Sequence, residues 1–206
     1  RSHGISVVPV DANVEAYEWL LRKASLEKTV RRLRRRFSNL DRKASLSHAQ
    51  QLVYAGLVAA LPAAGDTPAR IEKALAVLRD PADSGFFDPG QYDEAVATVE
   101  TALGLISAAY GPMSLGFSSY RTPFALLNPD EIKRDAGPDR NPFYEYFSGE
   151  LCRRLAAERV SLIGISVAFA SQLQPAYGLA HILRQQLPGV HITVGGPAVT
   201  QLFARS

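Results

Sequence analysis

Cysteine, methionine and tryptophan are nearly missing from this 206-residue chain, which contains one of each. Because Cys152 stands alone, the chain can form no internal disulfide and no multi-cysteine zinc or iron–sulfur site of its own. A reducing, cytoplasmic setting fits this cysteine usage. Since Met113 is the only methionine, residue 1 is not an initiator methionine, and we expect the chain to be a fragment or an engineered piece of a longer protein.

Long apolar runs are also missing. No run approaches the roughly 20 residues that a membrane-spanning helix needs. The N-terminal sequence RSHGISVVPV lacks the basic segment and apolar core of a secretory signal. The formal charge of +3 is too small to indicate a nucleic-acid partner. We therefore expect a cytoplasmic protein with neither a membrane nor a nucleic acid as its partner.

Familiar catalytic motifs are missing as well. The chain has no GxGxxG, Walker A, HExxH or GxSxG motif. Its histidines include no i, i+4 pair that could bind a metal from one helix face; they are His3, His48, His181 and His191. Cys152 lies in an apolar helical pattern, where a cysteine behaves as a small hydrophobic residue. The sequence therefore predicts no catalytic and no metal-binding residue within this chain.

The most regular pattern lies near the C-terminus. Val160–Val167 is a short, β-branched apolar run that predicts a strand buried on both faces. A helix with apolar residues at spacings of three and four follows, with Ser171 as its candidate N-cap and Pro188-Gly189 as its end. His191–Val194 predicts a second strand. Strand, helix and strand of these lengths favour a right-handed βαβ unit with parallel strands.

Ligands bind at the carboxyl ends of the strands in such sheets. The two strand ends of this unit, Ser166–Gln172 and Gly195–Thr200, consist largely of small and polar residues. Glycines at positions 195 and 196 would let a planar group or a phosphate approach the backbone closely. Hydroxyl and amide groups are supplied nearby by Ser166, Ser171, Gln172 and Thr200. From the pattern alone, a tight turn without a ligand explains the glycine pair equally well.

A further strand is predicted at the N-terminus. Gly4–Val10 is β-branched, and a helix from Val14 follows it, with Asp11 or Asn13 as the cap. An acid at such a strand end either caps the helix or contacts the ribose of a ligand. A dinucleotide or S-adenosylmethionine (SAM) site at Asp11 would also need a glycine-rich turn after an earlier strand, and none is present.

Four amphipathic helices in succession are predicted between the first strand and residue 112. The first has the stripe Leu26, Val30, Leu33, Phe37 and Leu40, and the next three follow caps at Ser45 or Ser47, at Asp66 or Thr67, and at Asp88. Leu115–Gly137 has no sustained period and predicts an extended connection with a short helix at Asp130–Arg134. Phe143–Glu158 returns to a helical pattern. The sequence therefore predicts an α/β protein with a large all-helical insertion.

Positive charge is concentrated in the first of these helices. Residues Arg22 to Lys43 include ten Lys or Arg and only two acids. One interpretation is a basic face for an acidic peptide, an RNA or a partner domain. The other is a solvated helix face in an arginine-rich protein. No aromatic residues are interleaved with the arginines as stacking platforms, which makes an RNA ligand less favoured.

The stretch GISVAFASQLQPAYGLAHILRQQLPGVHITVGGPAVTQL resembles the last part of the cobalamin-binding domain of B12-dependent radical SAM enzymes. The likeness rests on a GxS strand end, a Ser-Gln-Leu helix start and a GGP turn. Gly4–Val10 with DANVEAYEWLL is similar to the second strand and helix of that domain, and FFDPGQY and NPFYEYF resemble a subgroup more weakly. The resemblance implies a flavodoxin-like (Rossmann-like) five-stranded parallel sheet, of which this chain would hold part.

Carried over to this sequence, the resemblance implies a set of cofactor-binding residues. They are Asp11, Asn13, Ser166, Ser171, Gln172, Leu173, Gly195, Gly196, Pro197 and Thr200. It also implies a discontinuous cobalamin-binding domain over 1–22 and 143–206, with 23–142 as a helical insertion and connecting segment.

The chain departs from the family in what it lacks. The first and fifth strands of the fold are missing, and so is the DxHxxG motif, whose histidine the radical SAM branch usually does without. No CxxxCxxC is present, so SAM and a 4Fe-4S cluster are expected only in a downstream radical SAM barrel domain. The resemblance then implies C-methylation, or modification of a peptide or natural product, by the whole enzyme. The alternative is a non-catalytic module that binds a protein or peptide, with a vacant flavodoxin-like fold.

Overall fold

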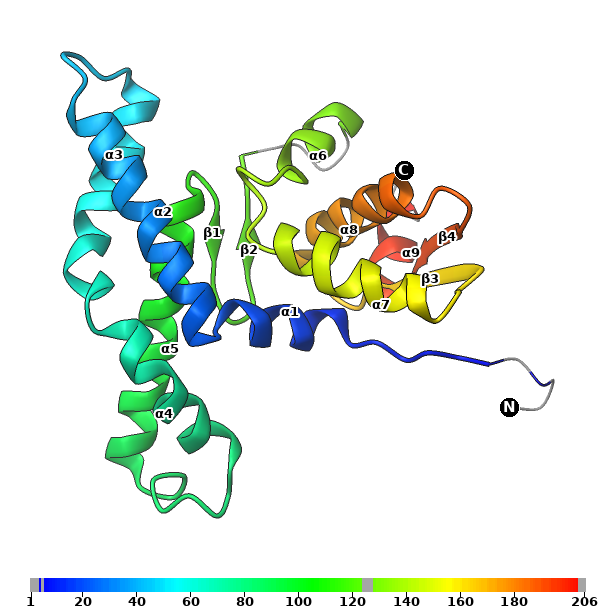
Figure 1. Cartoon of the computed structure of the whole chain (residues 1–206), viewed down its shortest axis with the longest axis horizontal. Helices are drawn as coiled ribbons and strands as arrows, with labels where there is room; N and C mark the ends of the chain where they lie inside the picture. Colours follow the sequence, from blue (N-terminus) through cyan, green and yellow to red (C-terminus); the bar gives the residue numbers. More distant parts are fainter. Residues whose placement is uncertain (1–3, 5, 124–127, 204–206) are drawn as a thin grey trace.

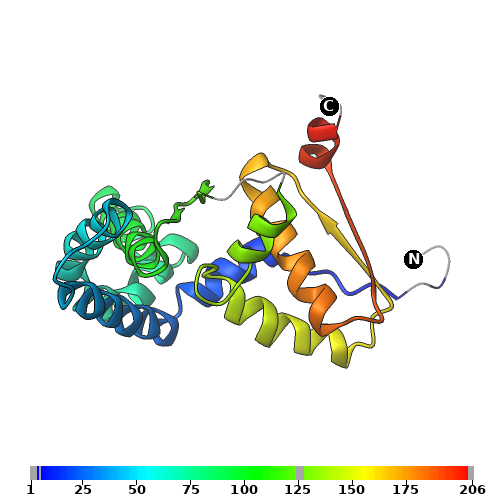
Figure 2. The same ribbon diagram turned by 90° about the horizontal axis from the view of Figure 1, so that it is seen from above.

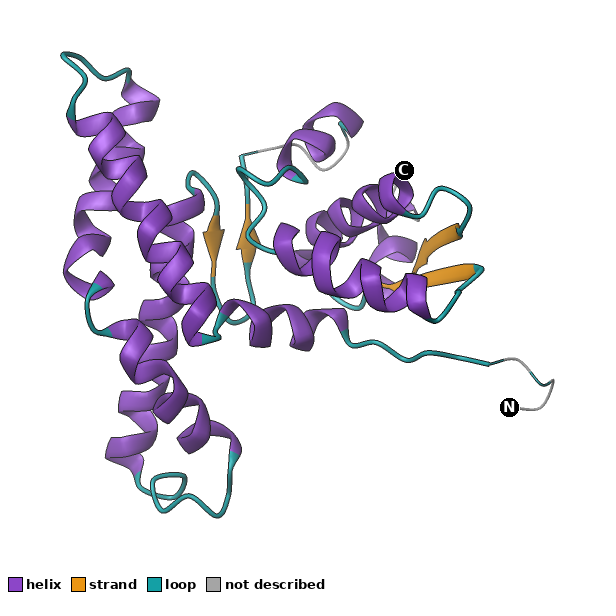
Figure 3. Cartoon of the chain, viewed as in Figure 1, coloured by secondary structure: helices purple, strands orange, loops and turns teal. Residues whose placement is uncertain are grey.

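The computed structural model describes residues 4, 6–123 and 128–203 of the chain. Helices dominate this part, and its strands form two small sheets (Figure 3). The helices are α1 (Ala12–Leu20), α2 (Lys23–Asp41), α3 (His48–Ala60), α4 (Thr67–Arg79), α5 (Pro89–Tyr110), α6 (Pro129–Asp135), α7 (Cys152–Ala157), α8 (Leu173–Gln186) and α9 (Pro197–Phe203). The strands are β1 (Ser114–Leu115), β2 (Tyr120–Arg121), β3 (Leu162–Ser166) and β4 (His191–Gly195). Short 3-10 helices η1 (Leu61–Ala64) and η3 (Ala170–Gln172) and a π-helix, η2 (Tyr146–Leu151), complete the described elements.

Helix α5 is the central element of the helical half, where α2, α3 and α4 pack around it (Figure 1). Asp88 caps its first turn by accepting a hydrogen bond from the backbone N–H of Gln91, as the sequence predicts. Its apolar stripe, including Val99, Leu103 and Ile106, is almost completely buried. The four helices predicted between residues 26 and 110 are therefore confirmed. They are stable because each one buries its apolar stripe against the others.

The C-terminus of α5 depends on two arginines of α2. The last carbonyl groups of any helix have no partner within the helix. Arg36 donates from Nη1 to the carbonyl of Ala109 (2.8 Å) and from Nη2 to that of Gly111 (2.8 Å), while Arg32 Nε also donates to Ala109 (3.1 Å). The Arg32 guanidinium lies 4.2 Å from the centre of the Tyr110 ring. Arg32 and Arg36, which belong to the predicted basic face, thus stabilise the fold. Burial lowers the pKa of the Arg36 guanidinium.

Helix α1 connects the helical half to the C-terminal half. Its Glu15 accepts hydrogen bonds from Tyr146 Oη (2.6 Å) in η2 and from Arg154 Nη2 (2.8 Å) in α7. Leu20 and Leu21 belong to one buried cluster that includes side chains from α4, α5, α7 and α8. This continuous core spans the boundaries predicted at residues 22 and 142. The division into two domains stays a prediction.

The connection after α5 differs from the predicted one. Residues 114–115 and 120–121 form an antiparallel hairpin, β1–β2, instead of an entirely extended segment. Such short strands carry too few residues to show a period. The short helix is confirmed as α6, whose buried Asp135 accepts hydrogen bonds from Tyr120 Oη (3.1 Å) and from Gln174 Nε2 (3.1 Å) of α8. This carboxylate therefore ties α6 to both the hairpin and α8. Residues 124–127 of the predicted connection lie outside the described residues.

The predicted helix at Phe143–Glu158 is confirmed, and so is the face that it turns to the core. The four residues predicted on that face are all buried: Phe147, Leu151, Cys152 and Leu155. Its middle is a π-helix, η2, which continues into α7.

The βαβ unit is confirmed as β3, α8 and β4, with β3 and β4 parallel over five residue pairs. One detail of the prediction is wrong: β3 is not buried on both faces, and Leu162 is 61% exposed. The reason is that β3 and β4 are the only strands in their sheet within the described residues. A flavodoxin-like sheet needs further strands, so that part of the prediction stays a prediction.

The strand predicted at Gly4–Val10 is not formed by its described residues. Gly4 and residues 6–10 have no regular structure, and Val7 is 74% exposed; Ile5 lies outside the described residues. The segment extends away from α1 without pairing with β3 (Figure 1). A β-branched composition favours a strand only where a neighbouring strand accepts its hydrogen bonds.

Within the described residues, no helix has the length and apolar character that crossing a membrane requires.

Replacing Arg36 with Ala should lower the free energy of unfolding by about 2 kcal/mol, because charge-assisted hydrogen bonds to part-buried carbonyls are lost. Urea denaturation followed by circular dichroism measures this. Arg34→Ala is the matched control, since Arg34 lies exposed on the same helix. Equal losses for the two variants would contradict the role given to Arg36.

Candidate functional site

The carboxyl ends of β3 and β4 lie side by side, as a ligand site in this fold class requires. Ser166 is the register partner of Gly195, and the N–H of Val167 donates to the carbonyl of Gly195 (2.8 Å). Both strands run in the same direction, and β4 leads into α9 (Figure 2). The structure thus brings together the two predicted strand-end segments.

Gly196 has a structural role at this edge. Its φ of +106° is a conformation that residues with a side chain rarely adopt. A Cβ at this position would lie 2.6 Å from the carbonyl oxygen of Val167 and 2.7 Å from its nitrogen. The backbone then turns into α9, where the N–H of Ala198 donates to the carbonyl of Val167 (3.2 Å). Gly196 therefore lets the two strand ends pack against each other, and this packing accounts for the glycine without a ligand.

Gly195 behaves differently. A Cβ built on it would have no heavy atom within 4 Å, so the space beside its Cα is open. Its register partner Ser166 is exposed. This pair forms a stretch of accessible backbone and hydroxyl at the strand ends.

After the glycine pair, the chain forms a helix, α9, that the sequence did not suggest. Pro197 is the first residue of α9, a position that suits proline because its missing N–H would have no helical partner. Thr200 lies exposed in this helix and donates from Oγ1 to the carbonyl of Gly196 (3.2 Å). Pro197 and Thr200 therefore extend the strand-end surface along α9.

The loop after β3 corrects the predicted cap of α8. Ser171 lies within η3, and α8 begins at Leu173 without a side-chain cap. Gln172 closes the loop instead: its Oε1 accepts from the backbone N–H groups of Ala168 (3.1 Å) and Phe169 (3.2 Å). The amide oxygen of Gln172 is thus engaged within the protein.

Leu173 is buried rather than presented to a ligand. It lies in an apolar cluster with Val167 of β3's end and with Ala198 and Val199 of α9. Through this cluster, α8 and α9 pack against the end of β3 and hold the two strand-end segments together.

Asp11 and Asn13 belong to the start of α1. The Asp11 carboxylate accepts a hydrogen bond from the N–H of Val14 (3.0 Å), so it acts as the helix cap that the sequence allowed. Asn13 is exposed in the first turn. No strand pairing among the described residues brings this helix start to the strand ends, because the expected strand before it does not form.

Of the predicted site residues at the strand ends, those that the structure describes offer hydroxyl groups, an amide and backbone but no general acid or base. Among the described residues, no group of three or more His, Cys, Asp or Glu side chains could hold a metal ion. Cys152 is buried in α7, and burial raises the pKa of its thiol, which disfavours the reactive thiolate. The geometry suits holding a ligand by its shape and by hydrogen bonds.

No family model, no curated protein and no solved structure matches this chain. The resemblance to cobalamin-binding domains rests on the sequence motifs alone.

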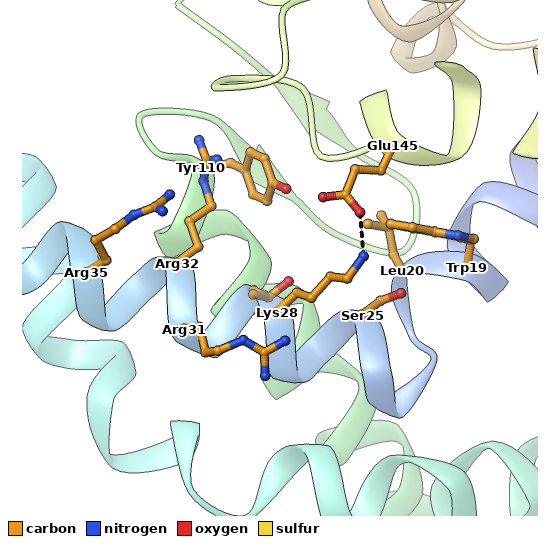
Figure 4. Close-up of a pocket in the computed structure, with 10 residues that line it drawn as sticks. Trp19, Leu20, Ser25, Lys28, Arg31, Arg32, Arg35, Tyr110 and Glu145 are labelled. Atoms are coloured by element: carbon orange, nitrogen blue, oxygen red, sulfur yellow. Dashed lines mark hydrogen bonds and ion pairs between the residues drawn. The ribbon is translucent and has the colours of Figure 1, made fainter. Parts of the chain in front are cut away.

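A second concave site lies away from the strand ends, beside α2 (Figure 4). It has a volume of about 390 Å³, and its lining residues are Trp19, Leu20, Ser25, Lys28, Thr29, Arg31, Arg32, Arg35, Tyr110 and Glu145. The concentration of positive charge in Arg22–Lys43 was the signal in the sequence. The aromatic residues were missed because α1 and α5 supply them in space, whereas none is interleaved among the arginines.

The two neighbouring glycines give a direct test of the strand-end geometry. Gly196→Ala should lower the free energy of unfolding by about 2 kcal/mol or more, through backbone strain and the clash with Val167. Gly195→Ala should change it by less than about 0.5 kcal/mol, because its surroundings are open. Thermal and urea unfolding measure both. Similar effects at the two positions would refute the distinction.

Proposed function

We propose that this chain is a cobalamin-binding region of a B12-dependent radical SAM enzyme. The observation that supports the proposal best is the parallel β3–α8–β4 unit with Ser166 opposite Gly195 at its carboxyl edge. The motifs GxS, Ser-Gln-Leu and GGP, which carry the family resemblance, fall at this edge in space.

The described residues fit one wall of such a site. The open backbone at Gly195 would allow a close approach of the cofactor's nucleotide tail, and the exposed Ser166 hydroxyl would hydrogen-bond to it. Ser171, Pro197 and Thr200 would extend the contact surface on either side. Gly196, Leu173 and Gln172 would support this wall, through the contacts that they make within the protein.

Asp11 and Asn13 remain expected contacts only if the start of α1 approaches the bound cofactor. In the structure, the Asp11 carboxylate already accepts the Val14 N–H.

The chain's own contribution would be to bind and orient the corrin. Cobalamin, when bound, would supply a cobalt centre that carries a methyl group. SAM and the 4Fe-4S cluster would belong to a radical SAM barrel domain downstream, which would be the partner of this region. The substrate of the whole enzyme would be a peptide or small molecule, modified by C-methylation or a related reaction.

The alternative function, a module that docks an acidic protein or peptide on the basic helix, has less support. Arg32 and Arg36 donate hydrogen bonds to the carbonyls at the end of α5, so these donors are not available to a binding partner. Of the exposed arginines, Arg31 and Arg35 line a hollow instead of a flat docking face.

The proposal predicts that hydroxocobalamin binds at the strand ends. Titration of the chain, and of the full-length protein, should change the visible spectrum of the corrin with saturation. Gly195→Val should weaken binding by about tenfold or more, equivalent to about 1.4 kcal/mol, because its side chain fills the open space.

Gly189→Val is the matched control, since Gly189 also has open space around its Cα but lies before β4, at the other end of the strand. Unfolding measurements confirm that both variants remain folded. Absence of any spectral change in the full-length protein would disprove the function, and equal weakening by both variants would disprove the location.

A further inference from the structure

The pocket beside α2 is lined by one continuous face of that helix. Lys28, Arg31, Arg32 and Arg35 have the spacing i, i+3, i+4 and i+7, which places these residues along one face of the helix. Among the described residues, Glu145, which directly precedes η2, is the only acid that lines the pocket. Four cations and one acid line the hollow, and Arg32 is also ion-paired with Asp139 at 3.5 Å. The lining therefore carries an excess of positive charge.

The charges divide into engaged and free groups. Lys28 Nζ forms an ion pair with Glu145 Oε2 at 3.0 Å, which neutralises the acid (Figure 4). Arg32 donates to the carbonyl of Ala109 and stacks on Tyr110. Arg31 and Arg35 are exposed and make no ion pair or hydrogen bond with any described residue. Two guanidinium groups one helical turn apart are therefore available to an anion.

Aromatic rings border the same hollow. Trp19 of α1 and Tyr110 of α5 line it, and each already has a cation near its ring: Lys28 Nζ lies 5.9 Å from Trp19 and Arg32 4.2 Å from Tyr110. A planar group in the pocket would meet aromatic faces as well as positive charge.

Hydroxyl groups at the base of the pocket add hydrogen-bonding capacity. Ser25 and Thr29 lie on the inner side of α2, 8% and 5% exposed. Their hydroxyls have no hydrogen-bond partner among the described residues. The volume of about 390 Å³ falls within the range of roughly 300–1,000 Å³ that is typical of small-molecule sites.

We propose that this pocket binds a small phosphorylated molecule that carries a planar ring, such as a nucleoside diphosphate. The planar fork of a guanidinium matches the oxygens of a phosphate, and Arg31 and Arg35 would each take one phosphate group. Trp19 and Tyr110 would contact the ring. The site is separate from the strand ends, so the proposal does not depend on cobalamin binding.

The chain contains its own probe for this test, because Trp19 is its only tryptophan and lines the pocket. ADP should change the Trp19 fluorescence with saturation, and isothermal titration calorimetry should give the same dissociation constant. Adenosine lacks the phosphates and pyrophosphate lacks the ring, so each should bind at least tenfold more weakly than ADP.

Arg31→Gln and Arg35→Gln should each weaken ADP binding by about tenfold, since each removes a charge-assisted contact. Arg34→Gln removes the same charge from an exposed position that does not line the pocket, and should leave binding within about twofold. All three positions are exposed, so the fold should survive, which circular dichroism checks.

Three results would overturn the proposal. The first is no saturable response to ADP at millimolar concentration. The second is equal weakening by Arg34→Gln and Arg35→Gln, which would show unspecific attraction. The third is displacement of ADP by a polyglutamate peptide at lower concentration than ADP itself requires, which would indicate a protein partner.

Discussion

The structure depends on how the C-terminal carbonyls of α5 are satisfied. This helix is the centre of the helical half, and its last carbonyls, left to themselves, would be partly buried without partners. Arg32 and Arg36 reach them from α2, which fixes both the rotation and the height of α2 against α5. Once α2 is held in this way, the neighbouring positions Lys28, Arg31 and Arg35 must line the hollow between α2, Tyr110 and Glu145. One helix-end constraint therefore also shapes a candidate binding site.

Neither interpretation of the basic segment describes all of its arginines. A run of arginines on a helix can be a solvated face or a binding face, and the sequence alone does not separate them. In space the run divides. Arg32 and Arg36 donate hydrogen bonds to carbonyls at the end of α5. Arg31 and Arg35 line the pocket that Trp19 and Tyr110 also line, and they make no ion pair or hydrogen bond with a described residue. The rings come from residues 19 and 110, before and far after the arginines in the chain. Only the packing of three helices reveals that charge and aromatic surface coincide.

Most of the helices could be predicted because their signals are local; α9 is the exception. The caps at Asp11, Ser47 and Asp88 and the stripe that includes Leu26 and Leu33 each specify a helix within one short segment. A strand forms only where a neighbouring strand accepts its hydrogen bonds, and the composition of a segment does not show whether such a neighbour exists. The run at Gly4–Val10 has the composition of a strand, but no described residue pairs with its described part, whereas β3 pairs with β4. The hairpin β1–β2 went unnoticed because two-residue strands carry no period.

The strand-end site shows the same limit at the scale of single residues. Gly195 and Gly196 are equivalent in the motif, yet the structure gives them opposite surroundings: Gly196 faces the backbone of Val167, and Gly195 faces open space. A glycine that only a close strand contact requires would persist in a fold that binds nothing. No contact within the protein requires a glycine where the space beside the Cα is open. A glycine at such a position is therefore better evidence for a ligand. The cobalamin proposal therefore depends on Gly195 and Ser166 more than on the GGP turn as a whole.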